Sequence, residues 1–494
     1  MEKQLRRIDY FLINANWFAL TVRSQALTPL IVPLLVQQFV GESAKGAYYG
    51  QLRLWTLMAA LLSQAIFGLL SDRSTSRFGR RRPFLAGGVI FEVIILALIG
   101  FNASMTGIAG YWVLFALIIL SMIGSNAAQA ATQAFIPDHV PSEKKGLASG
   151  IKALLELPVP LIFVSFVISP MVERGNLSSA VFTLIAVLVV CMIVSMFVRE
   201  KKLENTQPLN KEPFIRLLVM TGVFTAFILG TGFIVKQVIR WSAEIAPSRA
   251  VFLVGVAGLA AMVFSIVAGI WAATFTSLGQ QVRQHRSFVW WIINRLAFMV
   301  GSTNLASFMV FFLQEKYGFI RTEAAIPASF AITLVGIAIL IAAIPGGAAA
   351  DRFGKKTVII AAGLLGSIGT AAVVFSPADV ALLRSYLDLG QSIPTGVLIQ
   401  AMGGLYLGAI LIGLALGLFY AANWALGTSL IPEDRAGEFF GLANLAGAGA
   451  GAVGAYIGGP IADQFSYTLI IGLYGIVILL SLLALLGIRQ HTAA

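Results

Sequence analysis

Five ionisable side chains stand inside long apolar stretches of this sequence, where a charged group is costly to hold. They are Arg23, Glu92, Lys152, Glu156 and Arg295. In apolar surroundings such residues are rare and commonly mark a binding site or a proton pathway. Their chemistry points to the binding of a charged or hydrogen-bonding solute and to proton exchange.

The two carboxyl groups are the candidates for proton exchange. Lys152 and Glu156 are four residues apart, so on a helix they share one face and can touch. Burial favours the neutral form of a carboxyl group and a nearby cation favours its charged form, so a solute that occupies the site can switch such a group. We predict Glu156 as the coupling group and Glu92 as the second candidate. The alternatives are that Lys152 and Glu156 only neutralise each other, and that Glu92 has a fixed partner on a neighbouring helix.

Three cations against two acids leave one positive charge over, and an anionic or polyhydroxyl solute would supply its partner. Amide side chains both donate and accept hydrogen bonds, as hydroxyl-rich solutes require, and an aromatic ring can stack on a sugar face. The predicted substrate-binding residues are Arg23, Asn16, Trp17, Asn126, Gln129, Lys152, Asn294, Arg295 and Asn423. The alternative is that the amides join helices and that the aromatic residues only pack.

The sequence offers little for catalysis or metal binding. It has one cysteine, Cys191, and three histidines, and none of them shows a metal-ligand spacing. It has no glycine-rich phosphate loop that ends in a lysine and a hydroxyl residue, so ATP is not the expected energy source. We therefore expect no enzyme activity, no metal and no cofactor.

The composition is that of a membrane protein. Hydrophobic residues make up 58% of the 494 residues and charged residues only 11%, whereas soluble domains contain about 25% charged residues. The net charge of +12 does not indicate nucleic-acid binding, because the basic residues lie in short loops between apolar segments. The lipid bilayer is the expected environment.

Apolar segments long enough to cross a bilayer, roughly 20 residues each, recur about 14 times. They lie near 10–38, 47–71, 84–103, 110–136, 146–170, 179–198, 214–239, 250–275, 288–313, 325–349, 357–375, 402–430, 437–461 and 467–488. Lys and Arg are enriched in alternate loops, above all in 73–82 and 199–216. By the positive-inside rule these loops are cytoplasmic. We expect a multi-pass protein of the cell inner (plasma) membrane with both termini in the cytoplasm.

The sequence contains an internal repeat. The segment GLLSDR at 68–73 is matched by GAAADR at 347–352, and Phe-Gly with a basic cluster follows in both copies. Ile-Pro-Asp at 136–138 is matched in the same order by Ile-Pro-Glu at 431–433. We predict an all-α polytopic membrane protein with two six-helix halves, 1–199 and 287–494, and two inserted helices within 200–286. Parallel six-helix repeats resemble the major facilitator architecture, which implies a binding site between the halves near the membrane midplane.

The repeated motif is the predicted cytoplasmic gate. It comprises Gly68, Asp72, Arg73, Gly79, Arg80, Arg81, Asp351 and Arg352. A carboxylate that ends a helix can face cationic side chains, or the N-terminus of a helix from the opposite half. Breaking that contact would allow the other access state. The alternative is a helix end followed by positive-inside charges.

The run GLLSDRSTSRFGRRRP at 68–83 resembles the corresponding loop of the sucrose and glycoside carriers, the glycoside-pentoside-hexuronide-like group of the major facilitator superfamily. Trp17, Asn126 and Gln129 resemble the same group. Two positions differ, because Met122 replaces an acid taken to carry the proton and Gln133 replaces an arginine. The resemblance implies a sugar or glycoside substrate and a coupled proton.

We therefore expect a secondary active transporter that moves a small solute, with a sugar or glycoside as the expected class, by alternating access coupled to a proton or another cation. One alternative is an exporter of drugs or of amphipathic, lipid-like compounds. Another is a non-transporting membrane sensor or assembly factor on the same fold. The expected partners are the substrate, the coupling ion and the lipid bilayer, and the expected oligomeric state is a monomer.

Overall fold

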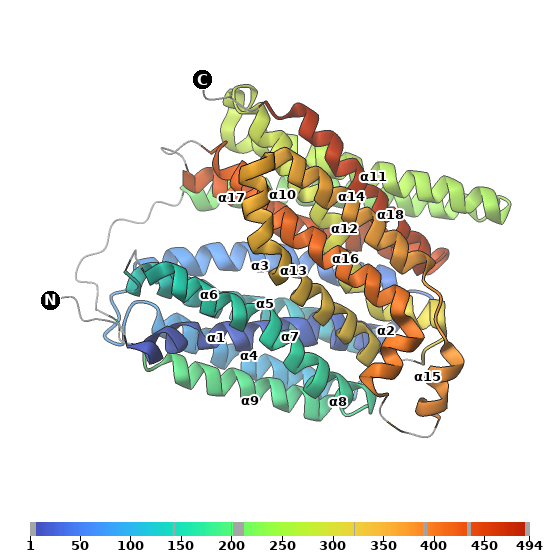
Figure 1. Cartoon of the computed structure of the whole chain (residues 1–494), viewed down its shortest axis with the longest axis horizontal. Coiled ribbons are helices and arrows are strands. Elements are labelled where there is room, and N and C mark those ends of the chain that lie inside the picture. Colours follow the sequence, from blue (N-terminus) through green and yellow to red (C-terminus); the bar gives the residue numbers. More distant parts are fainter. Residues whose placement is uncertain are drawn as a thin grey trace. The chain divides into compact units, whose positions relative to one another are not determined.

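The computed structural model describes residues 6–141, 144–198, 200, 212–320, 322–388, 391, 393–431 and 436–489 (Figure 1). Over these residues the chain is helical and contains no strand. Fourteen of the described helical segments are long and apolar enough to cross a membrane. This confirms the predicted all-α polytopic fold and its number of spans. A helix satisfies its backbone N–H and C=O groups internally, as a hydrocarbon environment requires.

The chain divides into two compact units. Unit 1 consists of Met1–Phe39 and Ala59–Phe214, and unit 2 of Val40–Met58 and Ile215–Ala494. Helix α3 (Lys45–Asp72) therefore contributes its first part to unit 2 and its second part to unit 1. The three-part division expected from the repeat (1–199, 200–286 and 287–494) stays a prediction.

Unit 1 contains two spans that are interrupted within the helix. The first combines α1 and α2 around a short π-helical turn, Leu27–Ile31, and the fifth combines α6, α7 and α8. Pro158 starts α7 and has no backbone N–H to continue the hydrogen bonding of α6. The helices of this unit, besides the second part of α3, are α1 (Arg7–Ala26), α2 (Val32–Val40), α4 (Arg82–Asn102), α5 (Gly107–His139), α6 (Lys145–Glu156), α7 (Pro158–Phe163), α8 (Ser169–Glu173) and α9 (Leu177–Ser195).

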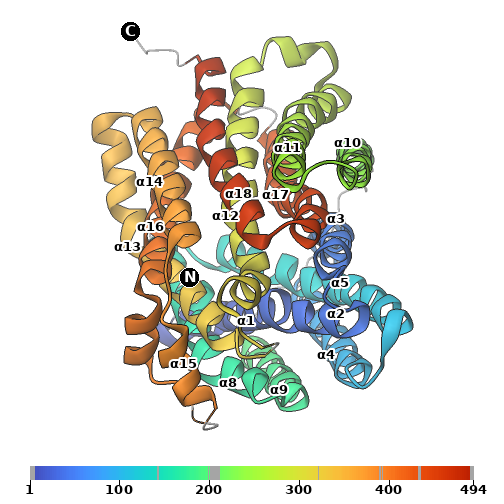
Figure 2. The ribbon, with the colours of Figure 1, turned by 90° about the vertical axis from the view of Figure 1, so that its right-hand side faces the viewer.

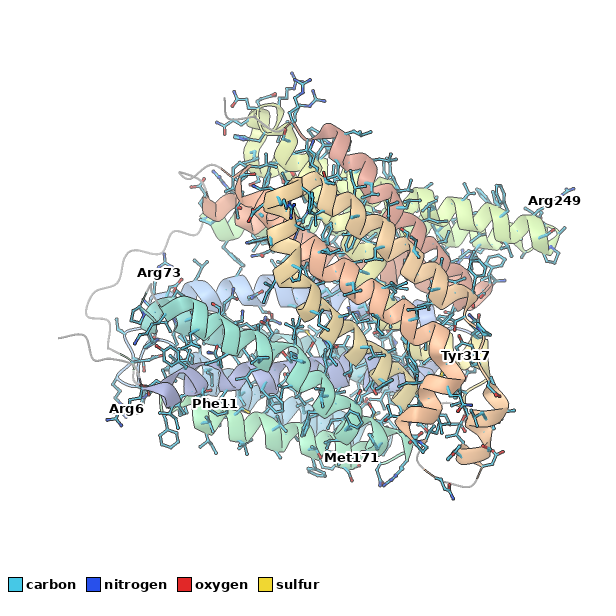
Figure 3. All side chains as sticks on the ribbon, in the orientation of Figure 1. Arg6, Phe11, Arg73, Met171, Arg249 and Tyr317 are labelled. Atoms are coloured by element: carbon cyan, nitrogen blue, oxygen red, sulfur yellow. The ribbon has the colours of Figure 1, made fainter. Side chains whose placement is uncertain are left out.

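Within unit 1, α1 packs on α9 and α6, and α4 packs on α5 and α9. Large apolar side chains such as Phe101 and Phe182 are exposed on its outer surface, as expected for a surface that faces lipid. Arg6 and Arg73 lie at the same end of the unit (Figure 3), in agreement with the prediction that both belong to one side of the membrane.

Unit 2 contains the remaining spans and the two inserted helices. In it α13 and α14 pack on α16, while α12 packs on α17 and α18. The inserted helices α10 and α11 lie side by side as a hairpin (Figure 2), with Gly269 of α11 facing Phe224 of α10. The helices are α10 (Glu212–Ser242), α11 (Pro247–Leu278), α12 (Arg286–Tyr317), α13 (Ala325–Phe353), α14 (Lys355–Phe375), α15 (Val380–Leu387), α16 (Thr395–Thr428), α17 (Ala436–Gln464) and α18 (Tyr467–Ser481).

A glycine-rich face of α17 lets the first part of α3 approach to backbone contact. A Cβ atom on Gly459 would overlap the backbone of Gly46. Nearby, the Asp463 carboxylate accepts hydrogen bonds from the backbone N–H groups of Gly46 and Ala47, both at 2.7 Å. These N–H groups belong to the first turn of α3 and have no partner within that helix. Close backbone packing and a carboxylate cap together hold this part of α3 on α17.

We predict that Gly459→Ala lowers the melting temperature of the detergent-purified protein, whereas Gly447→Ala does not. The new methyl group at position 459 forces the two backbones apart, which corresponds to about 1–3 kcal/mol for an overpacked contact. Gly447 lies on the same helix and has nothing within 4 Å of an added Cβ. Equal melting temperatures for the two variants would contradict this packing.

Candidate functional site

The first predicted pair of opposite charges is Arg23 of α1 and Glu92 of α4. Arg23 Nε lies 2.6 Å from Glu92 Oε1, and the two side chains are only 4% and 1% exposed. Ser121 of α5 donates to the same carboxylate oxygen at 2.8 Å and accepts a hydrogen bond from Arg23 Nη2. Three helices of unit 1 are therefore joined around one sealed ion pair, and Glu92 has the fixed partner of the alternative interpretation.

The second pair, Lys152 and Glu156 of α6, is more accessible. Lys152 Nζ lies 3.4 Å from Glu156 Oε2, and the side chains are 27% and 37% exposed. The same ammonium lies 4.0 Å from the ring centre of Trp17 on α1, while the buried Trp17 Nε1 has no hydrogen-bond partner among the described residues. The structure brings these three predicted residues together as a cation, an acid and an aromatic ring.

The predicted amides of unit 1 do not form one network. Asn16 Nδ2 donates to Thr132 Oγ1 at 2.8 Å and so joins α1 to α5. Asn126 Nδ2 donates to the Met122 carbonyl of its own helix at 2.8 Å. Gln129 lies one turn further along α5 and is half-buried. Asn16 thus has a helix-joining contact, and its Oδ1 is left without a partner in the described part of the chain.

In unit 2, Asn294, Arg295 and Asn423 do meet. Arg295 Nη1 donates to Asn423 Oδ1 at 3.2 Å, and Asn423 Nδ2 donates to Asn294 Oδ1 at 2.9 Å. Asn294 Nδ2 in turn donates to the Ser481 carbonyl of α18 at 3.0 Å. Trp291, which the sequence did not single out, donates from Nε1 to the Asn423 carbonyl at 2.8 Å. Helices α12 and α16 are therefore joined through a continuous polar chain that ends on a guanidinium group.

The first copy of the repeated motif forms a cluster of ion pairs in unit 1. Arg81 contacts Asp72 at 2.5 Å and Asp138 at 2.9 Å, and Arg80 contacts Asp138 at 2.5 Å. Asp138 was not among the predicted gate residues. Its position in the repeated Ile-Pro-Asp segment could have identified it. Asp72 therefore pairs with a cation of its own unit, one of the two partner types that the sequence predicts.

A carboxylate missed in the sequence completes this cluster. Glu200 accepts hydrogen bonds from the backbone N–H groups of Arg81 at 2.8 Å and Arg82 at 3.4 Å, at the start of α4. Gly79 has a positive φ of 108° and a Cβ there would meet the Glu200 side chain, so glycine suits the position on both counts. Gly68 and Arg73 lie outside the ion pairs, and Arg73 donates to the Leu69 carbonyl at 3.3 Å.

The second copy of the motif is arranged differently. Asp351 and Arg352 are both exposed, and neither takes part in an ion pair with another described residue. Arg352 lies 5.2 Å from the ring centre of Phe353. The Ile-Pro-Glu segment that corresponds to Asp138 falls at 431–433, and residues 432–435 lie outside the described residues. The described part of the second copy lacks the ion cluster of the first.

No group of three or more His, Cys, Asp and Glu side chains that could hold a metal ion occurs among the residues described. The arrangement can bind hydrogen-bonding and charged solutes and can exchange a proton at an accessible carboxylate. Several contributing residues were not predicted, because their role depends on which helices face each other: Ser121, Thr132, Asp138, Glu200 and Trp291.

Comparison with known proteins agrees with this architecture. A family model described as Major Facilitator Superfamily matches residues 17–313 and 291–494. The chain is similar in fold to a D-xylose-proton symporter (15% identity, 98% of each chain, TM-score 0.62) and to an auto inhibited POT family peptide transporter (14% identity, 98% of each chain, TM-score 0.62). A nucleoside transporter NupG has a similar fold (10% identity, 99% of this chain and 100% of the other, TM-score 0.61).

A short segment is also similar to the Sucrose transport protein SUT1 of Oryza sativa subsp. japonica and of Oryza sativa subsp. indica. In both cases the identity is 40% over 48 residues, which is 10% of this chain and 9% of the relative. The match thus spans about a tenth of the length of these curated relatives.

The contrast in exposure between the two ion pairs predicts different effects of neutralising their acids. We expect Glu92→Gln to destabilise the protein by about 3–5 kcal/mol, because it leaves Arg23 as an uncompensated buried charge. Glu156→Gln should change the melting temperature little, since exposed pairs contribute little to stability. Thermal unfolding in detergent measures both. The double variant Arg23→Gln/Glu92→Gln should recover most of the loss, and equal destabilisation by the two single variants would contradict the distinction.

Proposed function

Because the chain belongs to the Major Facilitator Superfamily, we propose that it is a secondary active transporter that moves a sugar or glycoside together with a proton. The chain is a multi-pass membrane protein with the fold of a transporter rather than an enzyme. The proposal includes a plasma-membrane location with both termini in the cytoplasm, and a monomeric state.

The observation that carries the proposal is the cluster of Trp17, Lys152 and Glu156. Trp17 is only 3% exposed and its ring is covered by the Lys152 ammonium at 4.0 Å, so movement of Lys152 away from the ring would uncover an aromatic face suited to a sugar. The accessible carboxylate of Glu156 is suited to proton exchange. The short match to sucrose transport proteins supports this substrate class, and a D-xylose-proton symporter shares the fold.

The cluster also provides a route for coupling. When Glu156 is ionised, it holds Lys152 against Trp17 through the 3.4 Å contact. Protonation of Glu156 removes that attraction and releases the ammonium to donate to substrate. Proton binding and substrate binding then favour each other, as symport requires. We assign coupling to Glu156 rather than to Glu92, because the Glu92 carboxylate is sealed against Arg23.

The proposal predicts sugar uptake driven by a proton gradient. Purified protein in liposomes would be offered labelled monosaccharides, disaccharides, glycosides, nucleosides and dipeptides, with and without an inwardly directed proton gradient. We expect accumulation of at least one sugar or glycoside that requires the gradient and is abolished by a protonophore. Trp17→Ala should raise the KM of that substrate roughly tenfold, since stacking on an aromatic ring contributes on the order of 1 kcal/mol or more.

Trp112→Ala is the matched control, because Trp112 lies in the same unit but is 49% exposed on the outer surface. Its KM should equal that of the wild type. If the gradient drives uptake of dipeptides or nucleosides but of no sugar, the substrate class is one of these and not a sugar. If the protein transports none of these compounds, the proposed function is contradicted. The remaining alternatives are then an exporter of drugs or amphipathic compounds and a non-transporting sensor or assembly factor.

A further inference from the structure

Arg295 is a charged group of α12 that no described residue of unit 2 neutralises. Its Nη1 makes one hydrogen bond, to Asn423, and its buried Nε has no partner in the part of the chain that the structure describes. Helices α16 and α18 contain no acidic residue. The acid of α12, Glu315, accepts hydrogen bonds from the backbone N–H of Tyr467 at 2.9 and 3.1 Å instead. The guanidinium group therefore keeps unused donors and its full charge.

The surroundings hold this guanidinium group in place. The Asn423 side-chain amide donates from Nδ2 to Asn294, which leaves its Oδ1 to accept from Arg295, while Trp291 donates to the Asn423 backbone carbonyl. The guanidinium carbon lies 5.9 Å from the ring centre of Trp291 and 5.1 Å from that of Trp424. Trp424 is 41% exposed. The charged group is stacked and oriented but not sealed, which is the state of a binding group and not of a structural ion pair.

Three other arginines in the described structure have acids of their own, whereas Arg53, like Arg295, has no ion pair with a described residue. Arg23 is paired with Glu92, and both Arg80 and Arg81 contact Asp138. Arginine stays protonated in proteins, and an unpaired charge within a membrane span is costly. Arg295 has no acidic partner among the described residues of the helices that hold it, so a counter-ion from outside these helices would offset this cost.

We propose that Arg295 binds an anionic group of the transported solute, so that the substrate is an acidic sugar and not a neutral one. The planar guanidinium group binds carboxylates and phosphates through two parallel hydrogen bonds, so the acidic sugar is a uronate or a sugar phosphate. The inference rests on the proposed transport of a sugar and specifies its class.

Binding to the purified protein in nanodiscs tests the inference with four probes at one ionic strength: D-glucuronate, glucose 6-phosphate, glucose and inorganic phosphate. We expect one of the two acidic sugars to bind at least about tenfold more tightly than glucose, and the one that does identifies the anion. Arg295→Gln should weaken the binding of that acidic sugar by roughly 10- to 100-fold, as expected for lost hydrogen bonds to a charged group. The affinity for glucose should not change. Arg295→Lys should lose part of the affinity, because it keeps the charge without the planar fork.

Arg53→Gln is the matched control. Arg53 lies in the unit 2 part of α3 and, like Arg295, has a buried Nε without a partner among the described residues, but it is not part of the polar chain that contains Asn423. The affinity of Arg53→Gln for the acidic sugar should stay within about twofold of that of the wild type. The melting temperatures of all variants should show that each is folded.

Three outcomes of the binding experiment would overturn the inference. If glucose binds as tightly as D-glucuronate and glucose 6-phosphate, binding does not depend on an anionic group of the sugar. Equal losses in Arg295→Gln and Arg53→Gln would indicate a diffuse positive field, and phosphate bound as tightly as glucose 6-phosphate would indicate a simple anion site. Proton-driven uptake of glucose by both wild type and Arg295→Gln would overturn the acidic class but leave the proposed function standing, whereas uptake of no sugar would contradict the proposed function itself.

Discussion

A charge within a membrane span needs a partner inside the protein, and this requirement organises the polar interior of both units. In unit 1 it joins α1, α4 and α5 around Arg23 and Glu92. In unit 2 it places Asp463 on the free N–H groups at the start of α3 and directs Lys316 to the carbonyl groups at the end of α14. Since an unsatisfied polar group in hydrocarbon is costly, these contacts determine which helices can be neighbours.

The same requirement separates structural charges from functional ones. In a sealed pair such as Arg23 and Glu92 the opposite charges offset each other, and the side chains are too buried to be reached by a solute, although Glu92 Oε2 has no hydrogen-bond partner among the described residues. The Lys152–Glu156 pair is partly exposed and lies against an aromatic ring, so its partners can change during transport. Arg295 has an oriented guanidinium group without an acid among the described residues of its own unit. We therefore propose that exposure and incomplete pairing, rather than residue type alone, mark the residues that take part in transport.

The helices were predictable from the sequence, since span length and apolar composition leave few alternatives in a bilayer, and the fourteen spans agree with those expected. Contacts within one helix were also predictable: Lys152 and Glu156 touch, as their four-residue spacing allows. Contacts between residues on different helices were not predictable, because apolar spans carry no periodicity that shows which faces meet. Arg23 and Glu92, for example, are 69 residues apart in the sequence. Asn126 illustrates this limit, since its amide donates to its own helix at Met122.

We propose that Glu156 couples proton movement to solute movement. The most direct test of this proposal compares two modes of transport by Glu156→Gln in proteoliposomes: exchange of labelled for unlabelled substrate without a gradient, and accumulation driven by an inward proton gradient. Exchange requires substrate binding and alternating access but no net proton transfer. If Glu156 is the coupling group, exchange continues at a rate close to that of wild type while gradient-driven accumulation is lost. Accumulation that persists in Glu156→Gln would contradict the proposal and place the coupling group elsewhere.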